Sequence, residues 1–224
     1  MTIEIRSLSS ENVWDAENAF YWFSHPARIS KLLSHFELYK LIIDLPGDFV
    51  EFGVYKSASL IRFATFRKIL ENDFSRKIVG FDAFGKFPHN SGNTSTDSKF
   101  IEKFENEGGD GLTVNEVKGI LNYKNYENIE LVEGDVFDTL PDYLSENPQC
   151  RISFLHLDMD VYAPTKFVLD QIWDRIVPGG LLVFDDYNSE EGATMAADEF
   201  LKKNNLKLTK NPFYNIPAFL IKNP

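Results

Sequence analysis

The fold class is decided by the stretch Asp48-Phe-Val-Glu-Phe-Gly-Val-Tyr-Lys-Ser-Ala-Ser59. Its first residues form a short apolar run that is typical of a buried β-strand, and Gly53 ends the run. A glycine there lets the backbone approach a ligand closely, and the helix predicted to begin near Ser57 offers free N–H groups. The stretch lacks a complete G-x-G-x-x-G pattern, so by itself it supports a dinucleotide site only weakly.

Four more apolar runs of strand length follow, and segments with helical spacing separate them. The predicted strands are residues 48–53, 77–82, 129–133, 152–158 and 181–186, and the helices between them include 58–70, 136–146 and 165–176. This alternation predicts a parallel sheet with helices on both faces. A helix at 192–204 and strands at 206–209 and 218–221 predict an antiparallel finish. The predicted fold class is therefore α/β, a Rossmann-like, doubly wound, mostly parallel seven-stranded sheet with an antiparallel edge strand.

Two helical patterns, at residues 11–23 and 28–44, precede the first strand. We interpret residues 1–46 as an N-terminal helical cover and residues 47–224 as the α/β domain, in one compact unit. Such a cover either caps a site or builds an oligomer interface, so the sequence leaves open whether the protein is a homo-oligomer.

Composition excludes several classes of protein. The chain carries 23 basic and 34 acidic residues, a net charge of -11, which disfavours nucleic acid as a partner. The single cysteine, Cys150, forms no intramolecular disulfide, and no Cys/His cluster has zinc spacing. No segment approaches the roughly 18 apolar residues that span a membrane. We therefore expect a cytoplasmic protein without a membrane span.

Carboxylates or glycines follow all five predicted core strands. They are Glu51 and Gly53, Asp82, Glu133 to Asp135, Asp158 and Asp160, and Asp185 and Asp186. In open parallel sheets ligands bind beyond the carboxyl ends of the strands, so we expect a site at this end of the sheet. For any single residue, capping of the next helix or contact with solvent is the simpler interpretation.

The densest group of acids is Asp158, Asp160, Asp185 and Asp186. Adjacent parallel strands lie about 4.8 Å apart, so carboxylates at their ends can converge. Such acids repel one another unless a cation balances them, and hard oxygen ligands suit a divalent metal, with Mg²⁺ favoured. The alternative is helix capping by Asp160 and turn formation by Asp186.

One motif points elsewhere. Tyr162 and Lys166 have the Tyr-x-x-x-Lys spacing of short-chain reductases. Pro164 lies between them at a predicted helix start, and no glycine-rich dinucleotide loop is present. We therefore interpret Tyr162 as a packed or substrate-facing residue and Lys166 as a solvated one.

Five blocks of the sequence also match a known family in order. They are residues 48–57, 81–88, 133–141, 155–165 and 178–187, and the last two include Leu155-His-Leu-Asp-Met-Asp160 and Pro178-Gly-Gly-Leu-Leu-Val-Phe-Asp-Asp-Tyr187. The chain resembles the macrocin O-methyltransferase (TylF-like) family of class I, S-adenosylmethionine-dependent enzymes, which methylate sugar hydroxyls. The resemblance implies that residues 47–224 are a methyltransferase domain.

The resemblance also implies roles for individual residues. Cofactor contacts fall on Glu51, Phe52, Gly53, Val54, Tyr55, Lys56, Ser57 and Ser59, on Asp82, Ala83 and Phe84, on Gly134, Asp135, Val136 and Phe137, and on Asp158. Asp82 would bind the ribose, and residues 134–137 would flank the adenine. Asp158, Asp185 and Asp186 would hold the metal, and Asp160 would be the general base. His156 competes for that last role, but strand alternation favours a neutral, hydrogen-bonded strand residue.

The function implied is metal-dependent transfer of a methyl group from S-adenosylmethionine to a hydroxyl of a sugar or of a glycan or natural-product precursor. A catechol-type O-methyltransferase and a catalytically silent cofactor-binding homologue stay open as alternatives. We expect two mobile covers over the acceptor, the N-terminal helices and the long segment 86–111, whose core at residues 89–96 is polar and loop-like. Lys86, His89 and Lys99 of that segment would contact a phosphate if a nucleotide or lipid carries the sugar, and a solvated loop is the alternative.

Overall fold

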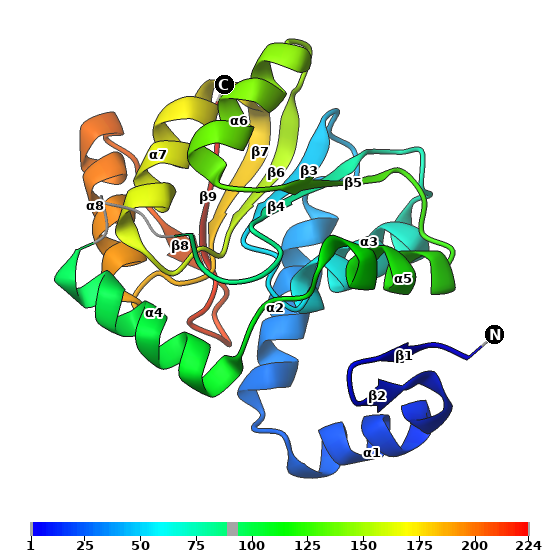
Figure 1. The fold of residues 1–224 in the computed structure, drawn as a ribbon. Helices are drawn as coiled ribbons and strands as arrows, with labels where there is room; N and C mark the ends of the chain where they lie inside the picture. Colours follow the sequence, from blue (N-terminus) through cyan, green and yellow to red (C-terminus); the bar gives the residue numbers. More distant parts are fainter. Residues whose placement is uncertain (1, 89–93, 224) are drawn as a thin grey trace.

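The computed structural model describes residues 2–88 and 94–223, and a seven-stranded sheet forms its centre (Figure 1). The strands lie in the order β5-β4-β3-β6-β7-β9-β8. Their bounds are β3 Asp48–Phe52, β4 Ile78–Asp82, β5 Ile129–Glu133, β6 Ile152–Leu157, β7 Ile176–Phe184, β8 Thr209–Lys210 and β9 Ala218–Ile221. The first five are parallel, and β9 runs antiparallel to both β7 and β8. The predicted α/β class, with its antiparallel pairing at one edge, is confirmed.

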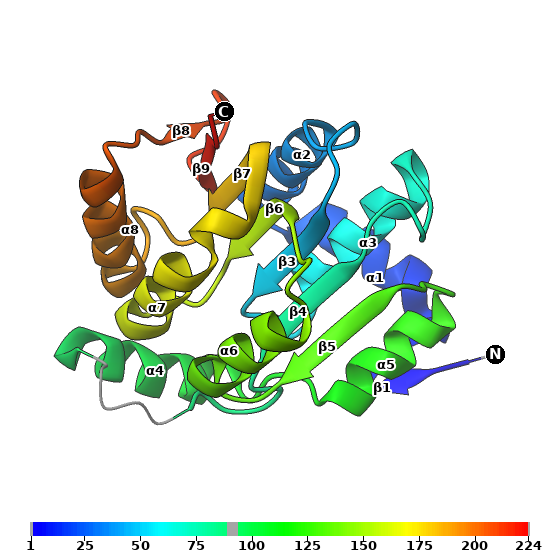
Figure 2. The same ribbon diagram turned by 90° about the horizontal axis from the view of Figure 1, so that it is seen from above.

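Helices cover both faces of the sheet (Figure 2). One face packs against α2 (Ala27–Lys40), α3 (Ala58–Leu70) and α5 (Val114–Tyr123), and the other against α6 (Val136–Glu146), α7 (Tyr162–Ile172) and α8 (Glu191–Asn204). Strand alternation makes this possible: Phe49 packs in the core on the side of α2, α3 and α5, whereas Val50 and Phe52 pack in the core on the side of α6, α7 and α8. A 3₁₀ turn, η2 (Trp173–Arg175), leads from α7 into β7.

The N-terminal region has two unlike parts. A small hairpin of β1 (Glu4–Ile5) and β2 (Leu8–Ser9), the turn η1 (Ser10–Asn12) and α1 (Val13–Phe23) stand apart from the sheet in Figure 1. No residue of α1 is buried, and Trp14, Trp22 and Phe23 are among its exposed side chains. The next helix, α2, instead buries Leu38 and Tyr39 in the same core as α3. The predicted boundary between residues 46 and 47 therefore falls between α2 and β3, which share one hydrophobic core.

The core of the segment 86–111 that was expected to be loop-like, residues 89–96, lies mostly outside the described residues, and its last two residues, Ser95 and Thr96, belong to a helix that the sequence analysis did not predict. Residues Ser95–Gly108 form the helix α4, which lies across the carboxyl end of the sheet in Figures 1 and 2. A capping box starts it: the Thr94 side chain accepts from the Asp97 N–H, and the Asp97 carboxylate accepts from the Thr94 N–H. Lys99 is exposed on this helix, and His89 lies outside the described residues.

No helix in the described ranges, 2–88 and 94–223, combines the length and the apolar composition needed to cross a membrane.

Candidate active site

A pocket lies at the carboxyl ends of β3, β4, β5 and β6, where ligands bind in sheets of this kind. Eleven of the residues that the resemblance assigns to cofactor binding or catalysis line it. They are Phe52, Gly53, Tyr55, Asp82, Ala83, Gly134, Asp135, Val136, Phe137, Asp158 and Asp160. We call this the strand-end pocket. These residues lie at or just after the ends of four different strands.

The turn after β3 is locked against the end of β6. Gly53 has a φ of +90°, and a Cβ at this position would overlap the carbonyl oxygen of Asp158. The Asp158 N–H in turn donates to the Phe52 carbonyl oxygen at 2.9 Å. Only glycine satisfies both the backbone angle and the close approach. The turn after β3 therefore packs directly against the Asp158 backbone.

Asp82 organises the same turn from the neighbouring strand. One carboxylate oxygen accepts from the Val54 and Tyr55 N–H groups at 2.7 and 2.9 Å, and the other accepts from the Phe84 N–H at 2.6 Å. Asp82 is also part of the pocket lining. The carboxylate thus shapes the pocket and faces it, and ribose binding by Asp82 stays a prediction.

Six residues assigned to the cofactor by resemblance lie outside the pocket lining. They are Glu51, Val54, Lys56, Ser57, Ser59 and Phe84. Val54 and Phe84 belong to the hydrophobic core, and the Lys56 ammonium donates to the Gly108 carbonyl oxygen at 2.5 Å. In the described part of the chain, Glu51 Oε2 and Ser57 Oγ are buried without a hydrogen-bond partner. Buried polar atoms are rarely left unpaired, so the end of β3 and the turn after it have hydrogen-bonding capacity that the described residues do not use.

The wall opposite the strands was missed by the sequence analysis. It is built by Phe87 and by Ile101 and Phe104 of α4. The Phe104 ring centroid lies 4.9 Å from that of Tyr55, whose hydroxyl donates to the Gly108 carbonyl oxygen at 2.8 Å. Helix α4 is thereby fixed to the turn after β3, and it gives the pocket an aromatic side.

Three carboxylates converge beside the pocket. Oxygen atoms of Asp158, Asp185 and Asp186 lie within 4.8 Å of one another, and we call these residues the acidic cluster. Asp160 adjoins it: its backbone has a φ of +63°, and its N–H donates to Asp186 Oδ2 at 3.1 Å. The structure thus brings together the four acids that the sequence placed at the ends of two strands. Three oxygen donors at this spacing fit a hard divalent cation.

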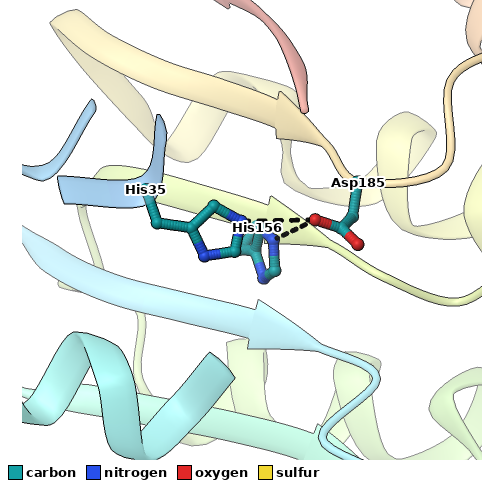
Figure 3. Close-up of side chains that lie close together, drawn as sticks. All are labelled: His35, His156 and Asp185. Atoms are coloured by element: carbon teal, nitrogen blue, oxygen red, sulfur yellow. Dashed lines mark hydrogen bonds and ion pairs between the residues drawn. The ribbon is translucent and has the colours of Figure 1, made fainter. Parts of the chain in front are cut away.

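Asp185 is the most heavily bonded member of the cluster. His35 Nε2 and His156 Nε2 lie 3.3 and 3.4 Å from its Oδ1 (Figure 3), and Lys31 forms an ion pair with its Oδ2. Lys31 and His35 come from α2 and were missed by the sequence analysis. Their spacing of four residues puts both on one helix face, but nothing in the sequence says what that face meets.

The two histidines differ in charge. Burial lowers the pKa of His35 to about 3, so His35 is neutral. Arg62 Nη1 lies 3.0 Å from His35 Nδ1 and donates to it, which leaves Nε2–H to donate to Asp185. Burial alone would lower the pKa of His156, but its hydrogen bonds to Asp185 and Glu51 raise it to about 10. The expectation that His156 is neutral is therefore wrong, although it is a buried, hydrogen-bonded strand residue as predicted.

The sequence missed the charge of His156 because its partner lies on another strand. Glu51 and His156 are opposite each other in the β3–β6 register, and their side chains lie 2.9 Å apart.

The crowded aspartates have pKa values shifted in opposite directions. Burial and then the charges of Asp185 and Asp186 raise the pKa of Asp158 well above its usual range. Burial and then the charge of Asp158 do the same for Asp160. Burial alone would also raise the pKa of Asp185, but the bonds from the two histidines and the charge of Lys31 hold it well below its usual range. A further cation would relieve the repulsion among these groups.

Tyr162 and Lys166 connect two helices and are not part of the pocket. Helix α7 begins at Tyr162, and both side chains bond Glu199 of α8, the Tyr162 hydroxyl at 2.9 Å and the Lys166 ammonium at 2.5 Å. Neither lines the strand-end pocket. They tie α7 to α8.

The sheet order, the pocket at the strand ends and the helices on both faces define an α/β protein with the Rossmann-like fold of class I methyltransferases. Residues 27–219 match the family model described as Macrocin-O-methyltransferase (TylF), and the chain belongs to this family.

Known relatives include both curated proteins and solved structures. A 4'-O-methyltransferase of Streptomyces olivaceus that acts on 8-demethyl-8-(2,3-dimethoxy-alpha-L-rhamnosyl)-tetracenomycin-C is 28% identical over 149 residues. That match covers 64% of this chain and 54% of the relative, so the chain spans about half of the relative's length. CalS11, a TDP-rhamnose 3'-O-methyltransferase of calicheamicin biosynthesis, has 28% identity and a TM-score of 0.67, with 96% of this chain and 87% of CalS11 covered. The O-methyltransferase NovP has the same fold, with a TM-score of 0.74 at 22% identity over 88% of this chain and 81% of NovP.

Proposed function

We propose that this protein transfers a methyl group from S-adenosylmethionine to a hydroxyl of a sugar or natural-product precursor, with the help of a divalent metal, preferably Mg²⁺. The observation that carries the proposal is the position of Asp158, which belongs to both the strand-end pocket and the acidic cluster. A cofactor in the pocket and an acceptor at the cluster would therefore meet around Asp158 and Asp160.

The residues of the pocket fit a nucleoside cofactor with a charged tail. The aromatic side chains of Phe52, Phe81, Phe137 and Phe104 offer flat apolar contacts, and Asp82 and Asp135 offer carboxylates for hydroxyl groups. The resemblance assigns Glu51 and Ser57 to the cofactor, and although neither residue lines the pocket, Glu51 Oε2 at the end of β3 and Ser57 Oγ in the turn after it are without a hydrogen-bond partner in the described residues. When bound, S-adenosylmethionine supplies the methyl group and a cationic sulfonium, which the acidic surroundings favour.

The acidic cluster fits a hard cation by the chemistry of its donors, since Asp158, Asp185 and Asp186 supply only carboxylate oxygens. Asp158, Asp185 and Asp186 would hold such an ion, and its chemical contribution would be to acidify the acceptor hydroxyl, which at neutral pH is otherwise almost wholly protonated.

The chain's own residues then do the remaining work. Asp160 lines the pocket and adjoins the cluster, where its carboxylate takes the proton of the acceptor hydroxyl. Gly53 lets the turn after β3 approach Asp158, which fixes the distance between the two halves of the site. Holding two reactants in line in this way is worth about 7–11 kcal/mol of barrier.

The relatives support a sugar as the acceptor. The curated relative is named for methylation of a rhamnosyl group, and CalS11 is named for TDP-rhamnose. A nucleotide-carried deoxysugar is therefore the first acceptor to test. Lys86 lines the pocket and is exposed, so it is available to an anionic group of such an acceptor.

The test is methyl transfer measured by mass spectrometry, with S-adenosylmethionine, Mg²⁺ and a panel of TDP-rhamnose, a rhamnosyl glycoside and catechol. We expect methylation of a sugar acceptor and its loss in excess chelator. Full activity in chelator contradicts the metal, and methylation of catechol alone contradicts the sugar. Calorimetry that detects no binding of S-adenosylmethionine contradicts the cofactor, and binding without turnover of any acceptor favours the silent homologue.

A further inference from the structure

Lys31 reaches the acidic cluster from the N-terminal region. Its ammonium forms an ion pair with Asp185 Oδ2, opposite the two histidines that bond Oδ1. The Lys31 side chain is 25% exposed, whereas Asp185 is 3% exposed. The ion pair therefore lies at the border between solvent and the buried cluster, with the lysine on the solvent side.

The partner of this ammonium belongs to the acidic cluster. Asp185 is one of the three carboxylates whose oxygen atoms converge within 4.8 Å of one another, together with Asp158 and Asp186. The chain thus directs a cation of its own at the group of oxygens that fits a divalent ion.

We propose that Lys31 is a positioning residue. Its ammonium supplies the positive charge beside the acidic cluster in the metal-free protein, and it is displaced when a divalent ion binds there. This inference rests on the proposed function, because it takes the cluster to be a metal site. Two cations sharing Asp158, Asp185 and Asp186 repel each other, so the ammonium weakens metal binding for as long as it stays.

The geometry allows Lys31 to leave without unfolding its helix. Lysine has a flexible four-carbon stem and a strongly hydrated head, and this one is already partly exposed. Helix α2 stays docked through His35, one turn further on, and through the buried Leu38 and Tyr39. Displacement therefore requires a change of side-chain rotamer and no movement of the backbone.

The experiment is Mn²⁺ binding to the full chain without cofactor or acceptor, measured by electron paramagnetic resonance. Lys31→Met removes the charge and keeps most of the stem, and Lys31→Arg keeps the charge. Lys40→Met is the matched control, because Lys40 lies on the same helix and contacts the exposed Glu37 through an ion pair and Phe36 through a cation–π interaction. If the methionine variant does not fold, Lys31→Gln repeats the test, since its amide still donates to Asp185.

We expect Lys31→Met to bind Mn²⁺ about tenfold or more tightly than the unaltered protein, since a charge within about 4–6 Å changes the proton affinity of a carboxylate by that much. Lys31→Arg and Lys40→Met should bind as the unaltered protein does. If Lys31 were purely structural, Lys31→Met would bind Mn²⁺ more weakly than the unaltered protein, because a loosened cluster binds metal less well. Equal affinity in all variants overturns the role of Lys31 and leaves the metal intact. Absence of Mn²⁺ binding in every variant overturns both.

Discussion

The strand-end pocket and the acidic cluster share Asp158 but are held together in different ways. The pocket depends on contacts between neighbouring strand ends, such as the bonds from Val54 and Tyr55 to Asp82. The cluster depends on partners far away in sequence: Lys31 and His35 lie 154 and 150 residues before Asp185. Short motifs that follow strands thus specify where a ligand lies, whereas the charge balance of the site is set by helix packing.

The largest effect is expected where pocket and cluster meet. Asp160→Asn keeps the shape of the side chain but removes the proton acceptor, so kcat should fall by about 10²–10⁴-fold. Binding of S-adenosylmethionine should be unchanged in calorimetry, because the pocket stays intact. Asp174→Asn, at an exposed aspartate, is the control. Turnover of Asp160→Asn at the unaltered rate would remove Asp160 from the mechanism.

A change at the centre of the cluster should affect stability as well as the metal. Asp185→Asn removes the partner of Lys31 and His156 in a buried ion pair, so the free energy of unfolding should fall by about 3–5 kcal/mol in urea titrations. Mn²⁺ binding should be lost. Asp170→Asn breaks an exposed pair with Lys203 and should change little. An Asp185 variant as stable as the Asp170 variant would mean that the cluster is not held by these contacts.

A change confined to the pocket should leave the cluster alone. Asp82→Ala leaves the N–H groups of Val54, Tyr55 and Phe84 without their hydrogen-bond acceptor. The turns after β3 and β4 lose this support, so affinity for S-adenosylmethionine should fall by about a hundredfold. Mn²⁺ affinity should stay as it is, which separates the two halves of the site. Asp138→Ala, at an exposed residue of α6, serves for comparison. A parallel loss of Mn²⁺ binding would show that pocket and cluster are one cooperative unit.

The smallest effect is expected at the wall supplied by α4. Phe104→Ala removes one aromatic contact of the pocket, so affinity for S-adenosylmethionine should fall by about tenfold with kcat unchanged. Phe74→Ala is the matched control, since Phe74 is 79% exposed. Unchanged affinity in the Phe104 variant would place the cofactor away from α4.

The sequence predicted the elements whose signals are local. The helix predicted at 58–70 is α3, the one predicted at 136–146 is α6, and each follows the strand that the apolar runs indicate. The meeting of the acids at one end of the sheet was predicted for the same reason, because parallel strands end together. Helix α4 was missed because residues 86–96 are rich in polar and turn-forming types. The capping box of Thr94 and Asp97 was the available signal.

The counter-charges of the cluster had no local signal. Lys31 lies in a helix whose packing partner cannot be deduced from its own sequence, and it reaches Asp185 only because α2 packs against β6 and β7. The charge of His156 likewise depends on the register that sets it opposite Glu51. Residue types and strand ends are properties of a segment, whereas a charge state is a property of the packed molecule.

The most direct test is a crystal structure of the protein with S-adenosylhomocysteine and Mn²⁺, with the metal located by anomalous scattering. The expected result is the nucleoside in the strand-end pocket, Mn²⁺ on Asp158, Asp185 and Asp186, and the Lys31 ammonium withdrawn from Asp185. Mn²⁺ bound elsewhere, or the nucleoside outside the pocket, would contradict a single active site built around Asp158.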